Sequence, residues 1–559
     1  MDAKILGVIL LIVGLIIGIG VGYVIHQPVT TTKIEYKTVT PSSMINETTT
    51  TLTMKSPLTG VSEEVTETTY QNSTMKWYQY VYYNYGNCYL PWWTTVTYYP
   101  SNLPKDPINE GNWTVYAYQQ DHESVININF PAENWSFEQM NALPLNAPFP
   151  AYKALGNRTA PVILTQLVGD AVGVTYFDGI IYVPSDANEL YAINAYTGKL
   201  IWEATTANSV MSNPIVVNTS RGPIVYVSVG DAGFSASHSI FAVITGNYKN
   251  VVRGYSYGAV YAFNATNGQL LWVHFDDGNV MPTPAYIDGL LIYGDGSGHI
   301  IALNATTGQV VWRDYVGVSA FDSMSSTNYY VFPNGTTIAI MGFTLALPPY
   351  GELIAVNVQN GQIVWNFSLP KGFTPFNTGM GDVSPAVDEE KGIVVQSTIV
   401  NFNKTNRTVG FAVFALNATN GHLLWIEQLV RGYVPPAFKG GVPTIYNGVV
   451  YVGTPVANEL FALNETNGKI LWVAQIPNVQ GPPNGAGGGR ANPVYVNGYI
   501  IEPAGAYIDV YNASNGQLVK SYYVGGRFGI VNAVVVGSTV FVDNSYNWVF
   551  AIPLNELIS

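Results

Sequence analysis

The sequence predicts an all-β protein, an eight-bladed β-propeller that follows an N-terminal transmembrane segment and a Thr-rich stalk. The first observation is a phrase that recurs along the chain, at residues 189–202 and again at 260–272. Further copies end at Trp312, Trp365, Trp425 and Trp472, and a seventh copy, 510–520, keeps the turn but lacks the Trp. The second observation is a three-strand remainder after the seventh copy, which makes most of an eighth blade. Small sheets repeated about every 40–70 residues are typical of a propeller.

Each copy of the phrase predicts two short strands joined by a tight turn. The strand residues are apolar, β-branched and aromatic. The turn carries a glycine, such as Gly198 or Gly268, where a left-handed backbone is needed. A Trp four residues after that glycine is large enough to dock between neighbouring sheets.

The composition favours an exported protein adapted to acid. Charged residues make up 11% of the 559, against a usual figure of about 25%, while 48% are hydrophobic, which excludes disorder. In acid, carboxylates are protonated and unpaired cations repel each other. With 23 Lys+Arg and 6 His, the fully protonated charge is +29, a modest value for this length. The formal charge of −13 at pH 7 and the absence of basic runs argue against nucleic-acid binding.

The N-terminal part predicts export. Residues 5–25 form an apolar run long enough to span a bilayer, with Lys4 before it and no small-residue cleavage pattern after it. We interpret residues 1–26 as a signal anchor, with a cleaved signal peptide as the alternative, and place the rest outside the cell or on its surface. Residues 27–75 are Thr-rich and predict a linker or stalk. Residues 76–159 form an aromatic-rich N-terminal segment that we expect to complete part of the propeller. The aromatic density is highest in 76–100, where we expect a strand pair lying on the propeller, an aromatic ligand platform being the alternative.

Residues 160–559 contain the propeller. The three-strand remainder at its end lacks an outermost strand. We expect a strand from the region 110–165 to complete this blade, closing the ring and removing two free strand edges.

Fifteen Asn-x-Ser/Thr sequons are present, and five of them occupy the same turn of different blades. The turns of one kind fall on one face of a propeller, so we predict a solvent-exposed face that carries sugars, although the same residues are also good turn formers. The predicted glycosylation sites are Asn264, Asn304, Asn417, Asn464 and Asn512. The long loops gather on the opposite face, where we expect the functional site; they are 231–258, 313–326, 366–384, 397–410, 426–442 and 473–491.

The hairpin phrase Ala-x-Asn-Ala-x-Asn-Gly-x-x-x-Trp resembles the repeats of the pyrroloquinoline-quinone (PQQ) propeller superfamily over residues 160–559. That superfamily includes quinone-dependent dehydrogenases, outer-membrane assembly scaffolds and tetrathionate hydrolases of acidophiles. The dehydrogenase branch typically stacks its quinone under a disulfide of adjacent cysteines and holds calcium, and the single cysteine, Cys88, cannot form that disulfide. We therefore expect no quinone, no other cofactor and no metal. The scaffold branch implies a lipoprotein with short loops, which the anchor and long loops do not match.

The resemblance to tetrathionate hydrolases fits the anchor, the composition and the blade count. It implies that water cleaves a sulfur–sulfur chain in acid outside the cell, giving thiosulfate, sulfur and sulfate, with an aspartate as acid or base. The nearest local match is Gly-Met-Gly-Asp-Val-Ser-Pro at 379–385, so Asp382 is the candidate catalytic residue. The rival acids are Asp276, Asp277 and Asp322. Asp295 is expected to form a turn, and His238 and His274 lack metal-ligand spacing.

A polythionate dianion needs fixed donors and positive charge. The candidate substrate-binding residues on the long-loop face are Arg490, Arg431, Arg253 and Lys439, with Arg527 nearby. Arg490 follows a Gly-rich stretch whose bare backbone can approach a ligand. The expected partners are this small anion and, through the N-terminal segment, the membrane, together with a homo-oligomer or ordered assembly. A non-catalytic surface or filament protein remains the alternative function, with a PQQ-dependent dehydrogenase behind it.

Overall fold

The computed structural model describes nineteen stretches of the chain. They are residues 33–38, 45–55, 62–72, 78–82, 86–90, 93–105, 112–139, 142, 144–146, 173–185, 189–206, 209–230, 258–276, 278–317, 324–344, 351–376, 380–434, 440–479 and 487–559. No helix in these stretches is long and apolar enough to cross a bilayer. The predicted transmembrane segment 5–25 lies outside them.

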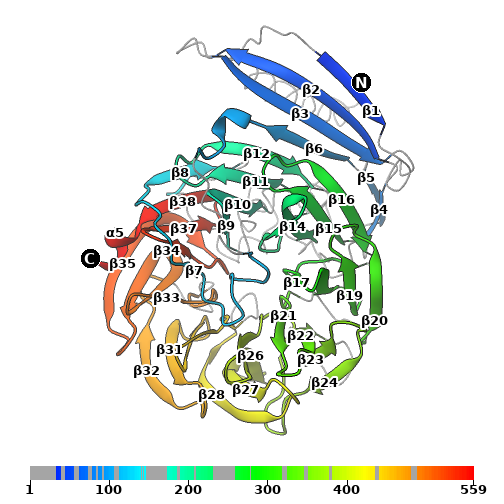
Figure 1. Ribbon diagram of the computed structural model, residues 1–559. Helices are drawn as coiled ribbons and strands as arrows, with labels where there is room; N and C mark the ends of the chain where they lie inside the picture. Colours follow the sequence, from blue (N-terminus) through cyan, green and yellow to red (C-terminus); the bar gives the residue numbers. More distant parts are fainter. Residues whose placement is uncertain are drawn as a thin grey trace, which may run out of the picture.

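Eight sheets are arranged radially around a central axis, which confirms the predicted eight-bladed propeller (Figure 1). Blades 2 to 6 each consist of four consecutive antiparallel strands, innermost first. In blades 2 and 3 these are β13 (Ile215–Thr219), β14 (Gly222–Val229), β15 (Gly258–Asn264), β16 (Leu270–Asp276), β17 (Ala285–Ile287), β18 (Leu290–Gly294), β19 (His299–Asn304) and β20 (Val310–Tyr315). In blades 4 to 6 they are β21 (Asn328–Val331), β22 (Thr337–Thr344), β23 (Gly351–Asn357), β24 (Ile363–Phe367), β25 (Ala386–Asp388), β26 (Ile393–Asn403), β27 (Thr408–Asn417), β28 (Leu423–Tyr433), β29 (Thr444–Tyr446), β30 (Val449–Thr454), β31 (Glu459–Asn464) and β32 (Ile470–Gln475).

Blade 1 is extended outward by strands from the N-terminal region. Its own strands are β9 (Thr175–Phe177), β10 (Ile180–Ser185), β11 (Glu189–Asn194) and β12 (Leu200–Thr205). Beyond β12 the sheet continues through β6 (Trp93–Tyr98), β3 (Ser62–Asn72), β2 (Ile45–Lys55) and β1 (Lys33–Thr38). The segment predicted as a Thr-rich linker thus contains three strands, for which β-branched Thr has a high propensity. Two further elements are a separate hairpin of β4 (Tyr78–Tyr82) and β5 (Gly86–Leu90), and the 3-10 helix η1 (Pro100–Asn102).

Blade 7 has three strands, β33 (Val494–Val496), β34 (Tyr499–Asn512) and β35 (Leu518–Phe528). The long strand β34 folds back on itself, because the N–H of Ala513 beyond its end donates to the carbonyl of Gly498 before its start, over 2.9 Å. Gly505, with φ 59°, lies at the fold. Blade 7 therefore has four antiparallel strand segments, as its neighbours do, with two of them supplied by β34.

Blade 8 is completed by the N-terminal region, as the three-strand remainder predicts. The C-terminal strands β36 (Val534–Val536), β37 (Thr539–Asn544) and β38 (Trp548–Pro553) are covered by β8 (Trp135–Glu138), which pairs antiparallel with β38. A short strand, β7 (Val125–Ile126), pairs parallel with the innermost strand β36. The ring is therefore closed by strands from both ends of the propeller.

The recurring Trp docks each blade onto the next. The indole Nε1 of Trp202 donates to the carbonyl of Ala265 in the following blade, over 2.9 Å, and equivalent bonds join Trp272 to Ala305 and Trp365 to Ala418. The indole lies against the turn glycine of that next blade, so that a Cβ on Gly268 would approach the Trp202 ring to 2.8 Å. The turn glycine is thus required twice, by its φ of 72° and by the Trp beneath it.

Ring closure uses the same device. Trp135 on β8 donates to the carbonyl of Ala195 in blade 1 over 2.9 Å and lies beneath Gly198. The seventh copy, which lacks the Trp, has Lys520 there instead. The Nζ of Lys520 donates to the carbonyl of Glu556 in the short helix α5 (Leu554–Ile558), over 2.6 Å, so the C-terminal helix takes the place of the missing turn.

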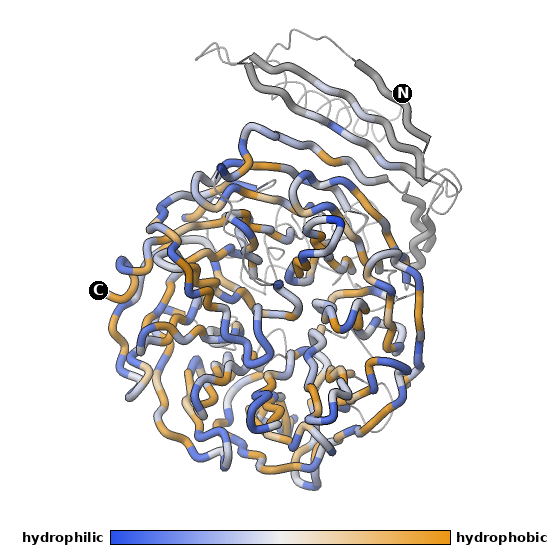
Figure 2. The backbone as a smooth tube through the Cα atoms, in the orientation of Figure 1, coloured by the Kyte–Doolittle hydropathy of each residue, from blue (hydrophilic) through white to orange (hydrophobic). Residues whose placement is uncertain are grey.

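Apolar residues concentrate along the strands of the blades (Figure 2). The buried clusters draw on adjacent sheets: one joins blades 4 and 5 through residues such as Ile340 and Phe414, and another joins blades 5 and 6 through Phe411 and Phe461. The hydrophobic core is therefore a series of layers between blades rather than one central cluster.

Candidate functional site

The two faces of the propeller differ in construction. One face carries two kinds of turn: the recurring Asn-Gly hairpin turns and the turns that follow the innermost strands. These turns lie on the same face because they hydrogen bond to each other; for example, the N–H of Ala305 donates to the carbonyl of Gly289 over 2.9 Å. We name this the turn face. The links between blades reach the opposite, loop face. On the turn face the Oδ1 of the sequon residue Asn264 accepts the backbone N–H of Thr266 over 3.0 Å, so the turn chemistry is present and glycosylation there stays a prediction.

A segment of the N-terminal region, residues 112–130, runs through the centre of the ring (Figure 1). We name it the axial segment. It bonds or packs to the innermost strand, or to the residues just before it, in all eight blades. The partners in order from blade 1 to blade 8 are Tyr176, Val216, Tyr286, Asn328, Val387, Ile445, Asn492 and Val535. The axial segment therefore contacts the inner side of all eight blades around the axis.

The axial segment has an unusual backbone and buried polar side chains. Three of its non-glycine residues have positive φ: Ala117 at 55°, Tyr118 at 73° and His122 at 66°. The hydroxyl of Tyr116 donates to Oδ1 of Asn492 over 2.9 Å, and the Nδ1 of His122 is 2.8 Å from the carbonyl of Pro443. Burial lowers the pKa of His122 to about 4. Strained backbone held by many contacts is commonly found where function depends on position.

A belt of buried hydroxyls links the blades at the loop-face end of the axis. The N–H of Asn213 donates to Oγ1 of Thr283 over 2.9 Å, the N–H of Thr283 to Oγ of Ser326 over 3.1 Å, and the N–H of Ser326 to Oγ of Ser384 over 3.0 Å. Each bond crosses from one blade to the next. The entries to blades 2 to 5 are therefore fixed relative to one another.

Asp382 lies in the link that enters blade 5, beside this belt. Its side chain is 6% exposed, and within the described chain neither carboxylate oxygen has a hydrogen-bond partner. The link itself is firmly held: Nε2 of Gln396 donates to the carbonyl of Met380 over 2.9 Å and to that of Val383, and the N–H of Met324 donates to the carbonyl of Gly381 over 2.7 Å. A buried carboxylate without a partner is costly unless a ligand or ion satisfies it.

The links that carry Asp382 and Arg490 meet at the same end of the axial segment. Val383, next to Asp382, packs with Tyr116, and Asn492, two residues after Arg490, accepts the hydrogen bond of Tyr116. Arg490 is 7% exposed in the link that enters blade 7. Asp382 makes no hydrogen bond to Arg490 within the described residues. Their shared role stays a prediction.

The other residues that the sequence predicted for the site do not lie beside Asp382 and Arg490 in the described structure. Arg431 is exposed on β28 of blade 5, where its Nη1 donates to the carbonyl of Asn401 over 3.0 Å. Arg253, Lys439, Asp277, Asp322 and His238 lie outside the described residues. Arg527 is on β35.

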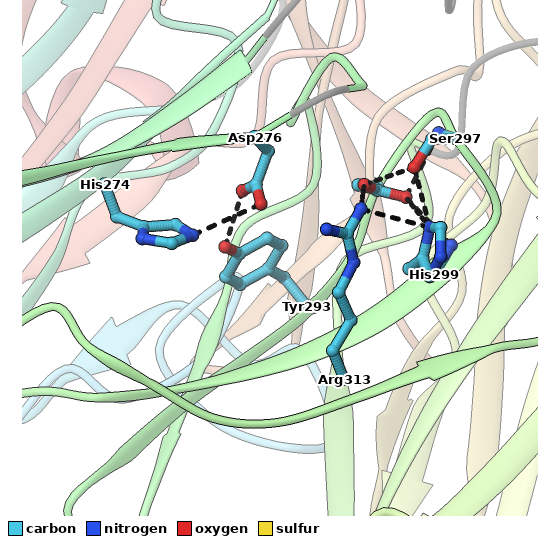
Figure 3. A network of polar contacts seen from close by, with 7 residues as sticks. His274, Asp276, Tyr293, Ser297, His299 and Arg313 are labelled. Carbon is cyan, nitrogen blue, oxygen red and sulfur yellow. Dashed lines mark hydrogen bonds and ion pairs between the residues drawn. The ribbon is translucent and has the colours of Figure 1, made fainter.

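A second polar cluster lies between blades 2 and 3 (Figure 3). Asp276, at the end of β16, accepts the hydroxyl of Tyr293 over 2.6 Å, and one of its oxygens is 3.3 Å from Nε2 of His274. Burial and the neighbouring Asp276 raise the pKa of Tyr293 well above its usual range. Asp276 is therefore a rival acid that, unlike Asp382, already has side-chain partners.

The other half of this cluster is centred on Asp295, whose partners Ser297, His299 and Arg313 are labelled in Figure 3. Its Oδ1 accepts the N–H groups of Ser297 and His299 over 3.1 and 2.8 Å, which confirms its expected role in a turn. Its Oδ2 also accepts the hydroxyl of Ser297 over 2.6 Å and lies 3.6 Å from Nη2 of Arg313. Burial, followed by the charge of Asp276, raises the pKa of Asp295.

Comparison with known proteins supplies the family. The family model described as outer membrane protein assembly factor BamB matches residues 135–236, 219–401 and 396–557. A tetrathionate hydrolase of Acidianus ambivalens is 43% identical over 494 residues, covering 86% of this chain and 91% of that protein. A tetrathionate hydrolase of Acidithiobacillus ferrooxidans is 38% identical over 428 residues, covering 76% and 81%. The chain belongs to the tetrathionate hydrolase family.

Among solved structures, a quinohemoprotein alcohol dehydrogenase from Comamonas testosteroni matches with a TM-score of 0.52 and 12% identity, covering 80% of this chain and 81% of that one. At this identity the likeness shows the fold alone. The resemblance to PQQ-type propellers is thereby confirmed as a resemblance of architecture.

The residues of this tetrathionate hydrolase family member do not fit a quinone site of the dehydrogenase kind. The single cysteine, Cys88, lies on β5 and cannot form a disulfide of adjacent cysteines. Within the described stretches no group of three His, Cys, Asp or Glu side chains is placed to hold a metal ion.

The sequence did not indicate several polar residues that the structure brings together. His299, Tyr293 and Arg313 come from three strands of blade 3, and no spacing relates them. The axial segment carries no recurring motif either. Its only signal was the isolated run of aromatic residues around Trp113, Tyr116 and Tyr118.

Proposed function

We propose that this protein hydrolyses tetrathionate on its loop face, outside the cell and in acid. The observation that carries the proposal is the identity of 43% to a tetrathionate hydrolase across 86% of this chain. The buried carboxylate of Asp382, which lacks a partner among the described residues, supports the same face as the reaction site.

The proposed reaction is S4O6²⁻ + H2O → S2O3²⁻ + S + SO4²⁻ + 2 H⁺. The water oxygen bonds to a terminal sulfonate sulfur, and the adjacent S–S bond breaks with its electron pair going to the sulfane sulfur. This step gives sulfate and a sulfane chain, which loses one sulfur atom to become thiosulfate. The water gives up both of its protons, so a group that accepts one during the attack lowers the barrier.

In this proposal Asp382 accepts that proton and a cation holds a sulfonate. This role requires an oxygen of the Asp382 carboxylate to accept the proton. Arg490, whose link meets that of Asp382 at Tyr116, is the proposed partner for the sulfonate. The paired N–H groups of a guanidinium suit two oxygens of one sulfonate.

Three variants test the assignment at acid pH by release of thiosulfate. Asp382→Asn keeps the shape of the side chain and should lower kcat about 100-fold or more, the usual contribution of a general base. Asp288→Asn is the matched control: Asp288 sits in a turn with φ 50° on the turn face, where Asn447 and Asn497 occupy equivalent turns. Full activity in Asp382→Asn combined with loss in Asp276→Asn would move the role to Asp276. A correctly folded wild type without activity toward any polythionate would refute the function.

The proposed location rests on the sequence. We propose that residues 5–25 anchor the protein in the membrane and that the five turn-face sequons carry sugars. Cell fractionation and mass spectrometry of the native protein test both statements. Intact, unglycosylated protein in the cytosol would overturn them.

A further inference from the structure

Blade 5 carries a groove whose lining does not include Asp382. It has a volume of about 690 Å³ and is lined by Thr374, Pro375, Phe376, Asn401, Phe402, Asn403, Lys404 and Arg431. The strands β26, β27 and β28 have 11, 10 and 11 residues and extend beyond the innermost strand β25, which has three. We name this cavity the blade 5 groove.

One wall of the groove is a strap fixed by backbone hydrogen bonds. The N–H of Phe376 donates to the carbonyl of Ile399 over 3.0 Å, and the N–H of Asn401 donates to the carbonyl of Thr374 over 2.8 Å. The N–H of Thr374 in turn donates to Oδ1 of Asn401 over 2.9 Å. The groove is thus built by the fold rather than by loose side chains.

The groove is positively charged in a protein with a net negative charge. Lys404 and Arg431 line it, and Lys371 and Arg407 lie on the same segments. Those segments, 366–376, 399–408 and 428–434, contain no Asp or Glu, although the whole chain has 36 acids against 23 Lys+Arg. Within the described chain neither Lys404 nor Arg431 has an ion pair with a carboxylate.

The groove also offers an aromatic surface. Phe376 and Phe402 are stacked with ring centroids 4.4 Å apart, and Phe402 is 40% exposed. Arg431 is oriented through the bond from its Nη1 to the carbonyl of Asn401, and within the described residues its other N–H groups make no further hydrogen bond. Two cations beside an exposed ring suit an anion whose charges are separated by an apolar, polarisable body.

We propose that the blade 5 groove binds a polythionate dianion, with a sulfonate on Arg431, the other near Lys404, and the sulfane sulfurs against Phe402. This inference rests on the proposed function and adds a capture site to it. The strap leads within a few residues to Met380, Gly381 and Asp382 in the same link, so a dianion held here is close along the chain to the proposed reaction site.

The test uses Phe402→Trp as a fluorescent reporter, titrated with tetrathionate in the background of Asp382→Asn to prevent turnover. Because the chain has 12 Trp, the signal is read as the difference from Asp382→Asn alone. A saturable change is expected, and Arg431→Ala should weaken it about 10- to 100-fold, the loss typical of a charge-assisted hydrogen bond. The matched control Lys469→Ala removes one cation from the turn face and should change nothing.

The alternatives are separated by parallel titrations at constant ionic strength. Thiosulfate and sulfate that bind as tightly as tetrathionate would overturn the polythionate assignment in favour of a general oxyanion site. Binding only of a sulfated polysaccharide would overturn it in favour of a macromolecular partner. Absence of any saturable change, or a change that Arg431→Ala leaves intact, would overturn the site itself.

Kinetics give an independent readout that does not need the reporter. Arg431→Ala should lower kcat/KM by the same factor, with the loss mainly in KM. Turnover with unchanged kcat/KM in Arg431→Ala would refute the groove and leave the proposed function standing. Saturable binding in the groove without any turnover by the wild type would support the groove as a binding site and refute the proposed function.

Discussion

Two carboxyl groups of the axial segment should make this protein more stable in acid than at neutral pH. Burial, and to a smaller extent the charges of Asp388 and Glu389, raise the pKa of Asp121 to about 6. Burial, and to a smaller extent the charge of Asp121, raise the pKa of Glu123 to about 7. The folded state therefore favours the protonated forms. The resulting stabilisation is complete below about pH 4 and is lost as the pH rises through 6 to 7.

The size of the effect is set by these shifts. One pKa unit corresponds to about 1.4 kcal/mol, so the shift of Asp121 alone corresponds to at most about 3 kcal/mol. Both side chains are partly exposed and interact with each other, and solvent screening reduces the value. We expect the pair to contribute about 2–3 kcal/mol to the free energy of unfolding at acid pH, relative to pH 8.

The double variant Asp121→Asn/Glu123→Gln tests this reasoning. The amides cannot ionise, so the variant should unfold in urea with about 2–3 kcal/mol more stability than the wild type at pH 8 and with nearly the same stability at pH 3. Asn at 121 retains the oxygen that accepts the N–H of residue 123 over 3.0 Å. Glu390→Gln, which removes an exposed carboxylate, is the control and should behave as the wild type does. A double variant no more stable than the wild type at pH 8 would refute the argument.

Three further predictions concern ring closure and the proposed site. Trp135→Ala should lower the free energy of unfolding by about 2–4 kcal/mol, because it removes both the packing on Gly198 and a hydrogen bond; urea unfolding measures it, and an unchanged midpoint would contradict the docking role. Lys520→Ala should lower the free energy of unfolding by about 1 kcal/mol, because it removes the hydrogen bond to α5. Lys520→Trp should not restore this stability, because blade 8 has the helix α5 at the position where the other blades have the turn on which the Trp docks. Arg490→Ala should mainly raise KM for tetrathionate, by about 1.5–3 kcal/mol in binding, and a loss confined to kcat would exclude a role in holding the substrate.

The architecture could be predicted because each blade repeats one local solution. The turn residues need positive φ, as Asp288 and Gly289 show at 50° and 82°, and the Trp that comes after the hairpin turn must fill the gap between sheets. Those requirements are local in sequence, so they leave a periodic signal. The strand β8 was predictable for a different reason, because an incomplete blade leaves an unpaired edge that some other segment has to cover.

The site was harder to predict because its geometry depends on contacts between distant residues. Nothing near Tyr116 in sequence announces that it bonds to Asn492, 376 residues away. The same holds for Asp276 and Tyr293, whose hydrogen bond joins two blades. Asp382 is a candidate because of a local resemblance, and its catalytic role stays a prediction; the absence of a partner for its buried carboxylate among the described residues is visible only in three dimensions.

The construction of the ring supports the proposed position of the functional site on the loop face. On the turn face, each of the seven recurring hairpin turns has a Trp of the preceding blade beneath its glycine and a hydrogen bond to a neighbouring turn. At the axis, the axial segment bonds or packs against the innermost strand, or the residues just before it, in all eight blades. The links between blades, and the loops between the second and third strands of each blade, differ in length and residue type. Asp382, Arg490, the Asp276 cluster and the blade 5 groove all lie on those links or on strands that reach them, as expected if the scaffold is invariant and the chemistry is confined to what it leaves variable.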